Sequence, residues 1–516
     1  MNLTIIKKLN IIVLLGGFFL AGTSCRKWLA EKDVDPSNLS PETYYTVPAH
    51  AEAAIAAAYA QTRFINGGAG IFANNFSLLE ILTGTAKTET GQNTDLNNLI
   101  GLSYNGDNVF VNNWWNGPYS LIAQANLVLQ KVPGITPMDE AQKKRILGEA
   151  QFLRAWAYFY LVRLYGDVPL ITEPVDATSP QLLPTRTSKD SVYNQIVSDL
   201  TAAEASGLSW ADATGRASLG AVKAELAEVY LTMAGQPLNK GAAYYKLAAD
   251  KAKEVIVSGN FELFTNYFDL HNQATENRGE HIFEIQYLSG VADNPNQGIL
   301  LPNFKGVSAY GTEIGSTVPT LQFYNSFESG DLRAVDRQGF FYTSYYDEGS
   351  GPLKSLSAPY IYKHFDIIAN GTLGVNGTAT SSLNWPNIRY SQVLLTYAEA
   401  QNEADGSPNQ ASLDALSLIR TRAQLMTPAL VAFTQASFRE AVWRERWHEL
   451  CYEGITWFDM LRTRKDYVEA INSFDDFVGH KFPDNGAILT EKNLLLPLPV
   501  PEMQNNPNLR PNNPGY

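Results

Sequence analysis

Carboxylates and arginines crowd one stretch near the C-terminus, where a search for chemistry naturally begins. Glycoside hydrolases use two carboxyl groups roughly 5–10 Å apart, so a cluster of acids could mark such a site. Opposite charges three or four residues apart, however, also form ion pairs along one helix. We therefore interpret the cluster as structural and predict that the chain is not an enzyme. Its members are Glu445, Glu449, Glu453 and Asp459, with Arg444, Arg446, Arg462 and Arg464 among them.

Other catalytic and metal-binding patterns are missing from the sequence. His448-Glu449 opens like a zinc-protease motif, but Tyr452 stands where the second histidine ligand would be. None of the six histidines lies three or four residues from another, and no C-x-x-C pair occurs. We therefore predict no catalytic residue, no metal site and no cofactor.

The length and charge of the chain narrow the possible classes of function further. The chain has 516 residues, 45% of them hydrophobic, and a formal net charge of −13. Such a composition is typical of a folded protein with a large core. Nucleic-acid binding needs a cationic surface, so an acidic chain of this kind is not expected to bind nucleic acid.

The N-terminus has the pattern of an export signal. Two lysines precede an apolar stretch of 11 residues, from Ile11 to Ala21, which is shorter than the ~20 residues that span a bilayer. Small residues and then Cys25 follow, as at a lipidation site. We predict a lipoprotein signal peptide over residues 1–24 and a lipid on Cys25. An ordinary signal peptide followed by a chance cysteine is the alternative.

Most of the remaining chain has the periodicity of helices that come in pairs. Alternating large aromatic and small residues on these helices is typical of tetratricopeptide-like packing. A short strand is expected at 281–287, and three long irregular segments rich in polar and aromatic residues at 64–113, 286–318 and 340–387. The helices are expected at 51–62, 114–131, 143–166, 189–206, 217–235, 242–258, 388–404, 411–424 and 436–465, the last with a break at Gly454.

Six ordered motifs resemble those of the SusD/RagB family of outer-membrane lipoproteins. Thr456 departs from the pattern, since arginine is common at that place, and Arg510 lies where the last motif often reads differently. The motifs are 149–155 (EAQFLRA) continuing to 164–170 (LYGDVPL), 215–227 (beginning GRAS), 324–333 (ending DLR), 389–400 (ending YAEA), 445–462 (ending WFDMLR), and the end of the chain with 497–499 (PLP) and 513–516 (NPGY).

The resemblance implies a fold, a location and a partner. The fold would be mainly α, a tetratricopeptide-like scaffold of helix pairs with long irregular ligand-facing loops and few short strands. It would form one domain over residues 25–516, with helical repeats in a part at about 25–280 and a second part at about 281–516. The protein would be anchored in the outer membrane by lipid, facing the cell exterior. It would deliver a nutrient, usually an oligosaccharide, to a SusC/RagA-type TonB-dependent transporter.

The motifs are signatures of fold and interface, so ligand contacts must come from chemistry. Sugars present flat apolar faces and rings of hydroxyls, which exposed aromatic rings and polar side chains recognise. The three irregular segments have that composition, whereas Trp114 and Trp115 begin a helix and are expected in the core. The candidate ligand-binding residues are Phe72, Asn74, Asn75, Asn93, Asp95, Tyr104, Tyr310, Tyr345, Tyr346 and Trp385.

Two other classes of function remain open from the residues alone. A tetratricopeptide-type scaffold lipoprotein would bind protein or peptide partners only, and truncating the aromatic loops would then do little. A surface glycoside hydrolase would release reducing sugar from a polysaccharide.

Overall fold

The computed structural model describes residues 44–179, 182–301, 314–346, 353–370 and 381–516. The predicted signal peptide, Cys25 and Tyr310 lie outside these ranges. In the described part the chain is mainly helical, as predicted. The helices are α3 (Pro48–Gln61), α4 (Ser77–Ile81), α5 (Thr94–Ile100), α6 (Val109–Lys131), α7 (Glu140–Tyr165), α8 (Lys189–Glu204), α9 (Leu219–Ala234), α10 (Ala242–Val257), α11 (Asn296–Leu300), α12 (Leu321–Asn325), α13 (Ile367–Asn370), α14 (Tyr390–Asp405), α15 (Gln410–Arg422), α16 (Gln435–Glu449), α17 (Thr456–Thr463) and α18 (Val500–Asn505).

Local sequence explains where the long helices begin and end. Asp139 caps α7 by accepting a hydrogen bond from the backbone N–H of Gln142, and Ser188 and Ser218 cap α8 and α9 in the same way. Helix α7 stops at Gly166, whose φ of 72° lies in the left-handed region that glycine adopts readily. The break predicted at Gly454 separates α16 from α17.

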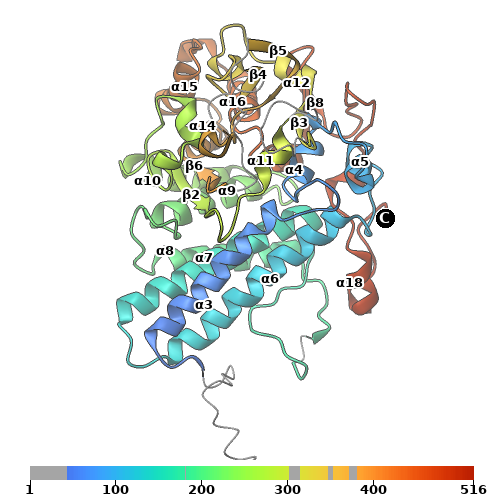
Figure 1. The fold of residues 1–516 in the computed structure, drawn as a ribbon. Coiled ribbons are helices and arrows are strands. Elements are labelled where there is room, and N and C mark those ends of the chain that lie inside the picture. The colour runs from blue at the N-terminus through green and yellow to red at the C-terminus, as the bar shows by residue number, and fades with distance from the viewer. Residues whose placement is uncertain (1–43, 180–181, 302–313, 347–352, 371–380) are drawn as a thin grey trace, which may run out of the picture.

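Successive long helices pack side by side. Helix α3 packs on α6 and α7, α7 packs on α8, and α9, α10 and α14 continue the packing toward α15 and α16 (Figure 1). Alanines at the contacts, such as Ala155, Ala221 and Ala398, are fully buried and let the helix axes approach closely. This arrangement confirms the helix-pair scaffold.

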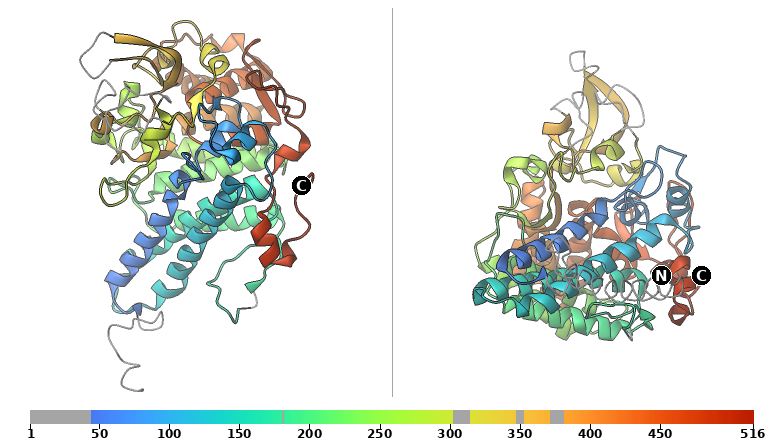
Figure 2. Two further views of the ribbon diagram at one scale, coloured as in Figure 1. Left: turned by 45° about the vertical axis from the view of Figure 1, so that its right-hand side comes forward. Right: turned by 60° about the horizontal axis from the view of Figure 1, so that its bottom comes forward.

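Few strands accompany the helices. In the described ranges they form four antiparallel pairs, β1–β3, β2–β6, β4–β5 and β7–β8. The hairpin of β4 and β5 projects from the body on the side away from α6, α7 and α8 (Figures 1 and 2). The strands are β1 (Ala86–Lys87), β2 (His281–Ile285), β3 (Val318–Pro319), β4 (Phe341–Tyr346), β5 (Leu353–Ile361), β6 (Trp385–Arg389), β7 (Lys465–Val468) and β8 (Ser473–Asp476).

The acidic stretch near the C-terminus belongs to a buried charge network. Arg333 pairs with Glu445 at 2.6 Å, Arg389 with Glu453 at 2.6 Å, and Arg422 with Glu449 at 2.7 Å. The expected pairing along one helix is therefore wrong for these three glutamates, because their partners come from other elements. We call this set the charge network: Glu280, Asp331, Arg333, Arg389, Arg422, Glu445, Glu449 and Glu453.

One local pair of the expected kind does form. Asp459 lies 2.8 Å from Arg462, three residues further along α17. Among the described residues, no helix is long and apolar enough to cross a membrane.

Candidate ligand-binding face

A small hairpin between α3 and α4 holds an aromatic ring in solvent. The backbone N–H of Ala69 donates to the carbonyl of Ala73 at 2.7 Å, and Ile71 and Phe72 form the tip. The side chains of Ile71 and Phe72 are 54% and 48% exposed. Phe72 also has φ 56°, a conformation that is costly for a bulky residue. Backbone strain of this kind gathers at functional sites. We call residues 67–75 the Phe72 loop.

Asparagine side chains brace the Phe72 loop from behind. The amide of Asn93 donates to the carbonyls of Ala69 and Ile71, both at 2.9 Å, and its oxygen caps α5. The amide of Asn75 donates to the carbonyl of Phe64 at 2.6 Å. Asn74 donates to the side-chain oxygen of Asn296. All three asparagines among the candidates are thus buried, and they fix the loop's shape instead of presenting amides to solvent.

A second turn shares its base with the Phe72 loop. Arg63 donates to the carbonyl of Gln286 at 2.8 Å, and Asn66 donates to the hydroxyl of Tyr287 at 3.0 Å. The turn itself, which we call the Leu288 turn (residues 286–296), exposes 57% of Leu288 and 80% of Val291. Two irregular segments far apart in the sequence therefore lie together, and both present apolar side chains.

Sequence reasoning missed three of these exposed apolar residues, Ile71, Leu288 and Val291. A signal for them exists, because Gly70 precedes Ile71 and Gly290 precedes Val291, and both glycines have positive φ. An aliphatic residue beside a turn glycine, in an otherwise polar segment, tends to lie at a loop tip.

The other candidates are placed elsewhere. Trp385 is 2% exposed, and its ring stacks on His364 with centroids 4.1 Å apart. Tyr104 is also buried, and its hydroxyl accepts a hydrogen bond from Asn493 at 3.1 Å. Asp95 is half-buried in the first turn of α5. Tyr345 and Tyr346 lie on β4, and Trp114 and Trp115 are in the core as expected.

Two acids beneath the Leu288 turn have no lysine or arginine within 4 Å among the described residues, although His281 lies 3.6 Å from Glu284. Glu284 accepts the backbone N–H of Asn277, and Glu276 accepts that of Asn384. Burial raises the pKa of Glu284 to about 8 and that of Glu276 to about 7. Burial also lowers the pKa of the neighbouring His281 to about 4. Glu284, Glu276 and His281 therefore stay uncharged in mildly acidic solution.

The residues of the sequence motifs form internal ion pairs. Glu149 of the first motif lies 2.7 Å from Arg216 of the second. Asp331 and Arg333 of the third are paired with each other at 2.7 Å, and Arg333 reaches Glu445 of the fifth. The motifs therefore mark positions that hold the fold together.

Comparisons with known proteins agree with this fold. The family model described as "SusD family" matches residues 333–516, and the one described as "Starch-binding associating with outer membrane" matches residues 33–231. A SusD-like protein of Formosa agariphila, named P2, is 28% identical over 93% of this chain and 94% of its own.

Solved structures of similar fold also belong to the SusD superfamily or share its fold. A SusD superfamily protein from Parabacteroides distasonis is 40% identical, with a TM-score of 0.85, over 90% of this chain and 98% of its own. Surface glycan-binding protein A from Bacteroides thetaiotaomicron, in complex with laminarihexaose, is 17% identical and shares the fold, with a TM-score of 0.72 over 91% of this chain and 100% of its own. On the ordered motifs, the helix-pair scaffold and these matches, the chain belongs to the SusD/RagB family.

Proposed function

We propose that this protein is a cell-surface lipoprotein that binds an oligosaccharide and delivers it to a SusC/RagA-type TonB-dependent transporter in the outer membrane. The Phe72 loop carries the proposal. It holds a half-exposed aromatic ring in a strained conformation, and buried asparagines fix that conformation. A rigid aromatic platform lowers the entropy cost of binding a sugar face.

The relatives support a glycan as the ligand. One solved structure of the same fold is named a laminarin-binding SusD-like protein, and another holds laminarihexaose. Two neighbouring loops with exposed apolar tips, the Phe72 loop and the Leu288 turn, could contact successive sugar rings in this chain.

The acids of the C-terminal stretch support binding without catalysis. Glu445, Glu449 and Glu453 are at most 4% exposed, and each lies against an arginine. Burial alone would raise the pKa of Glu449, but Arg422, Arg389 and Arg333 outweigh it and hold the pKa below its usual value. A general acid needs a proton to give near neutral pH, and this carboxylate does not hold one.

The location rests on the N-terminal pattern and on the family description. Cys25 follows an export signal that is too short to span a bilayer, and a matching family model is described as associating with the outer membrane. We place the protein outside the cell, beside the transporter that receives its ligand.

Titration calorimetry of the chain from residue 26 onward tests the proposal. The panel holds laminarihexaose, maltohexaose and xylohexaose. We expect saturable binding of one of them with no product released, and Phe72→Ala should weaken it by about tenfold, the effect of losing one stacked ring.

The matched control is Leu418→Ala, because Leu418 on α15 is 51% exposed and lies outside both loops. It should leave the affinity unchanged. Binding that Phe72→Ala leaves intact would remove the Phe72 loop from the site. Release of reducing sugar would contradict the absence of catalysis.

A further inference from the structure

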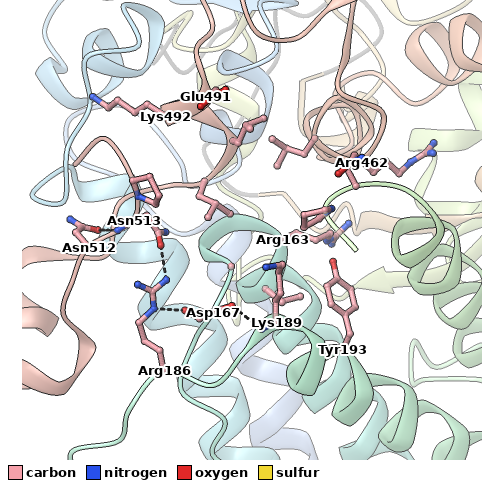
Figure 3. A pocket seen from close by; sticks show the side chains of 18 of the residues that line it. Arg163, Asp167, Arg186, Lys189, Tyr193, Arg462, Glu491, Lys492, Asn512 and Asn513 are labelled. Carbon is pink, nitrogen blue, oxygen red and sulfur yellow. Dashed lines mark hydrogen bonds between the residues drawn. The ribbon is translucent and has the colours of Figure 1, made fainter. Parts of the chain in front are cut away.

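A large cavity lies beside the C-terminal end of α7. Its volume is about 790 Å³, and it is bounded by the end of α7, the start of α8, helix α17 and the C-terminal tail (Figure 3). None of its lining residues belongs to the Phe72 loop or the Leu288 turn. We call it the cation-lined cavity.

The charge of this cavity is opposite to that of the protein. The whole chain carries 52 acidic and 39 basic residues, yet seven basic residues and two acidic ones line the cavity. One of the seven, Arg462, is paired with Glu399 and Asp459. Within the described residues, the other six have no carboxylate within 4 Å: Arg163, Arg186, Lys189, Arg464, Lys492 and Arg510.

Three polar groups on two helices surround the middle of the cavity. Lys189 and Tyr193 lie one turn apart on α8, and both side chains point toward Arg163 of α7 (Figure 3). By contrast, the side chain of Arg462 points away from them, toward its own carboxylates.

Aromatic rings lie closest to the guanidinium of Arg163, and no carboxylate of the described residues lies within 4 Å of it. Its guanidinium carbon lies 3.5 Å from the ring centroid of Phe159 and 3.7 Å from that of Phe458. Cation–π contact offsets part of the cost of burying a charge. The buried acids Glu225 and Glu228 also act on this charge, but neither is within salt-bridge distance of it. Burial accordingly lowers the pKa of Arg163.

Asp167, an acid that lines the cavity, does not form a salt bridge with these cations. Asp167 accepts the backbone N–H of Lys189 at 2.8 Å, and its carbonyl accepts the Nε of Arg186, also at 2.8 Å. Arg186 donates its remaining bonds to neutral oxygens, those of Pro511 and Asn513. The hydroxyl of Thr232, which lines the same cavity and is 4% exposed, has no hydrogen-bond partner in the described part.

We propose that the cation-lined cavity is a second binding site, which takes a small molecule bearing carboxylate, sulfate or phosphate groups. Such an anion supplies the directly contacting counter-ion that Arg163 and Lys189 lack among the described residues, and charge-assisted hydrogen bonds to it are strong. The volume fits a ligand of one or two sugar residues, within the usual range of small-molecule sites. An acidic sugar and a free inorganic anion share this chemistry, and the test separates them.

Calorimetry with three probes provides the test: sodium sulfate, a galacturonic acid disaccharide, and the neutral galactose disaccharide of equal size. We expect an anion to bind saturably and the neutral sugar not to bind. Lys189→Gln should weaken binding of the anion about tenfold, which is the effect of losing one charge-assisted hydrogen bond. The control is Lys253→Gln, because Lys253 is exposed on α10 outside the cavity and carries the same charge.

The outcomes divide cleanly. If the acidic disaccharide binds and sulfate does not compete with it, the ligand is an acidic sugar. If sulfate binds as strongly as the disaccharide, the ligand is a free inorganic anion. Absence of saturable binding by either anion overturns the proposal, and so does an affinity that Lys189→Gln leaves unchanged.

Tyr193→Phe is the second variant, in case Lys189→Gln fails to fold, since it removes only the hydroxyl that points toward Arg163. This variant too should weaken binding of the anion. Neutral hexasaccharides bind at the Phe72 loop if the proposed function holds, so failure at one site is distinguishable from failure at the other.

Discussion

The arginines of the charge network differ from those around the cation-lined cavity in what lies beside each guanidinium. In the network, Arg389 contacts Glu280, Glu449 and Glu453. At the cavity, Arg163 contacts two aromatic rings and no acid among the described residues. A buried cation that is fully paired holds the fold together, whereas one whose nearest acids, Glu225 and Glu228, lie beyond salt-bridge distance leaves charge available to a ligand. Residue type alone therefore does not reveal the role of an arginine.

The largest expected effect comes from breaking the charge network. Arg389→Leu leaves three buried carboxylates short of a partner, and such a loss costs about 3–5 kcal/mol of the free energy of unfolding. Chemical denaturation monitored by circular dichroism measures it. The control is Arg439→Leu, which breaks a pair with Glu403 whose arginine side chain is 30% exposed and should therefore cost less than Arg389→Leu. Equal losses in the two variants would contradict the distinction between the network and a surface pair.

Two buried glutamates offer the same comparison, because the stability that each contributes depends on pH. Glu449 has three arginine neighbours, whereas Glu284 has none and has a pKa raised to about 8. A raised pKa means that the stability due to protonated Glu284 is complete below pH 4.5, the unfolded value, and is lost as pH rises through about 8. The native protein should therefore become less stable over this range.

Glu284→Gln should remove that loss, because glutamine keeps a carbonyl oxygen for the N–H of Asn277 and cannot ionise. Thermal unfolding at pH 5 and pH 8 measures the difference between variant and parent. We expect the Tm of the variant to rise relative to that of the parent from pH 5 to pH 8. A difference that stays constant with pH would show that Glu284 is already ionised in the fold.

The smallest effect is expected at the cavity. Arg464 has no carboxylate partner in the described part, and burial lowers the pKa of its guanidinium. Arg464→Gln should therefore change the free energy of unfolding by less than about 1 kcal/mol in anion-free buffer. Added sulfate should then raise the Tm of the variant less than that of the parent. A loss as large as that from Arg389→Leu would make Arg464 part of the structural framework.

The fold could be predicted closely from the sequence because its signals are local. Helical periodicity, the caps at Asp139, Ser188 and Ser218, and the stop at Gly166 are all short-range features. The motif resemblance added the order of the elements.

The candidate site was less predictable because burial depends on tertiary contacts. Asn93 and Phe72 come from one polar segment, yet the asparagine is 4% exposed and the phenylalanine 48%. Asparagine serves equally well as a ligand contact or as a brace for backbone carbonyls, and only the position of Ala69 and Ile71 decides between the two. Trp385 looked equally available but packs against His364.

The cavity had no distinctive signal at all. Arg154 and Arg163 lie on the same helix, and Arg154 pairs with Asp199 at 2.7 Å while Arg163 has no such partner in the described chain. Which of two arginines finds an acid depends on a helix that lies 45 residues away along the chain. Periodicity and spacing do not contain that information.

The charge network also constrains the order in which the molecule can assemble. Its members run from Glu280 to Glu453, so Arg333 and Arg389 have no complete set of partners until almost the whole chain is present. A polypeptide that emerges N-terminus first, from a ribosome or through a secretion pore, therefore keeps this core open until its last tenth or so has appeared. Contacts so distant in sequence form slowly, so this part of the core closes late in folding.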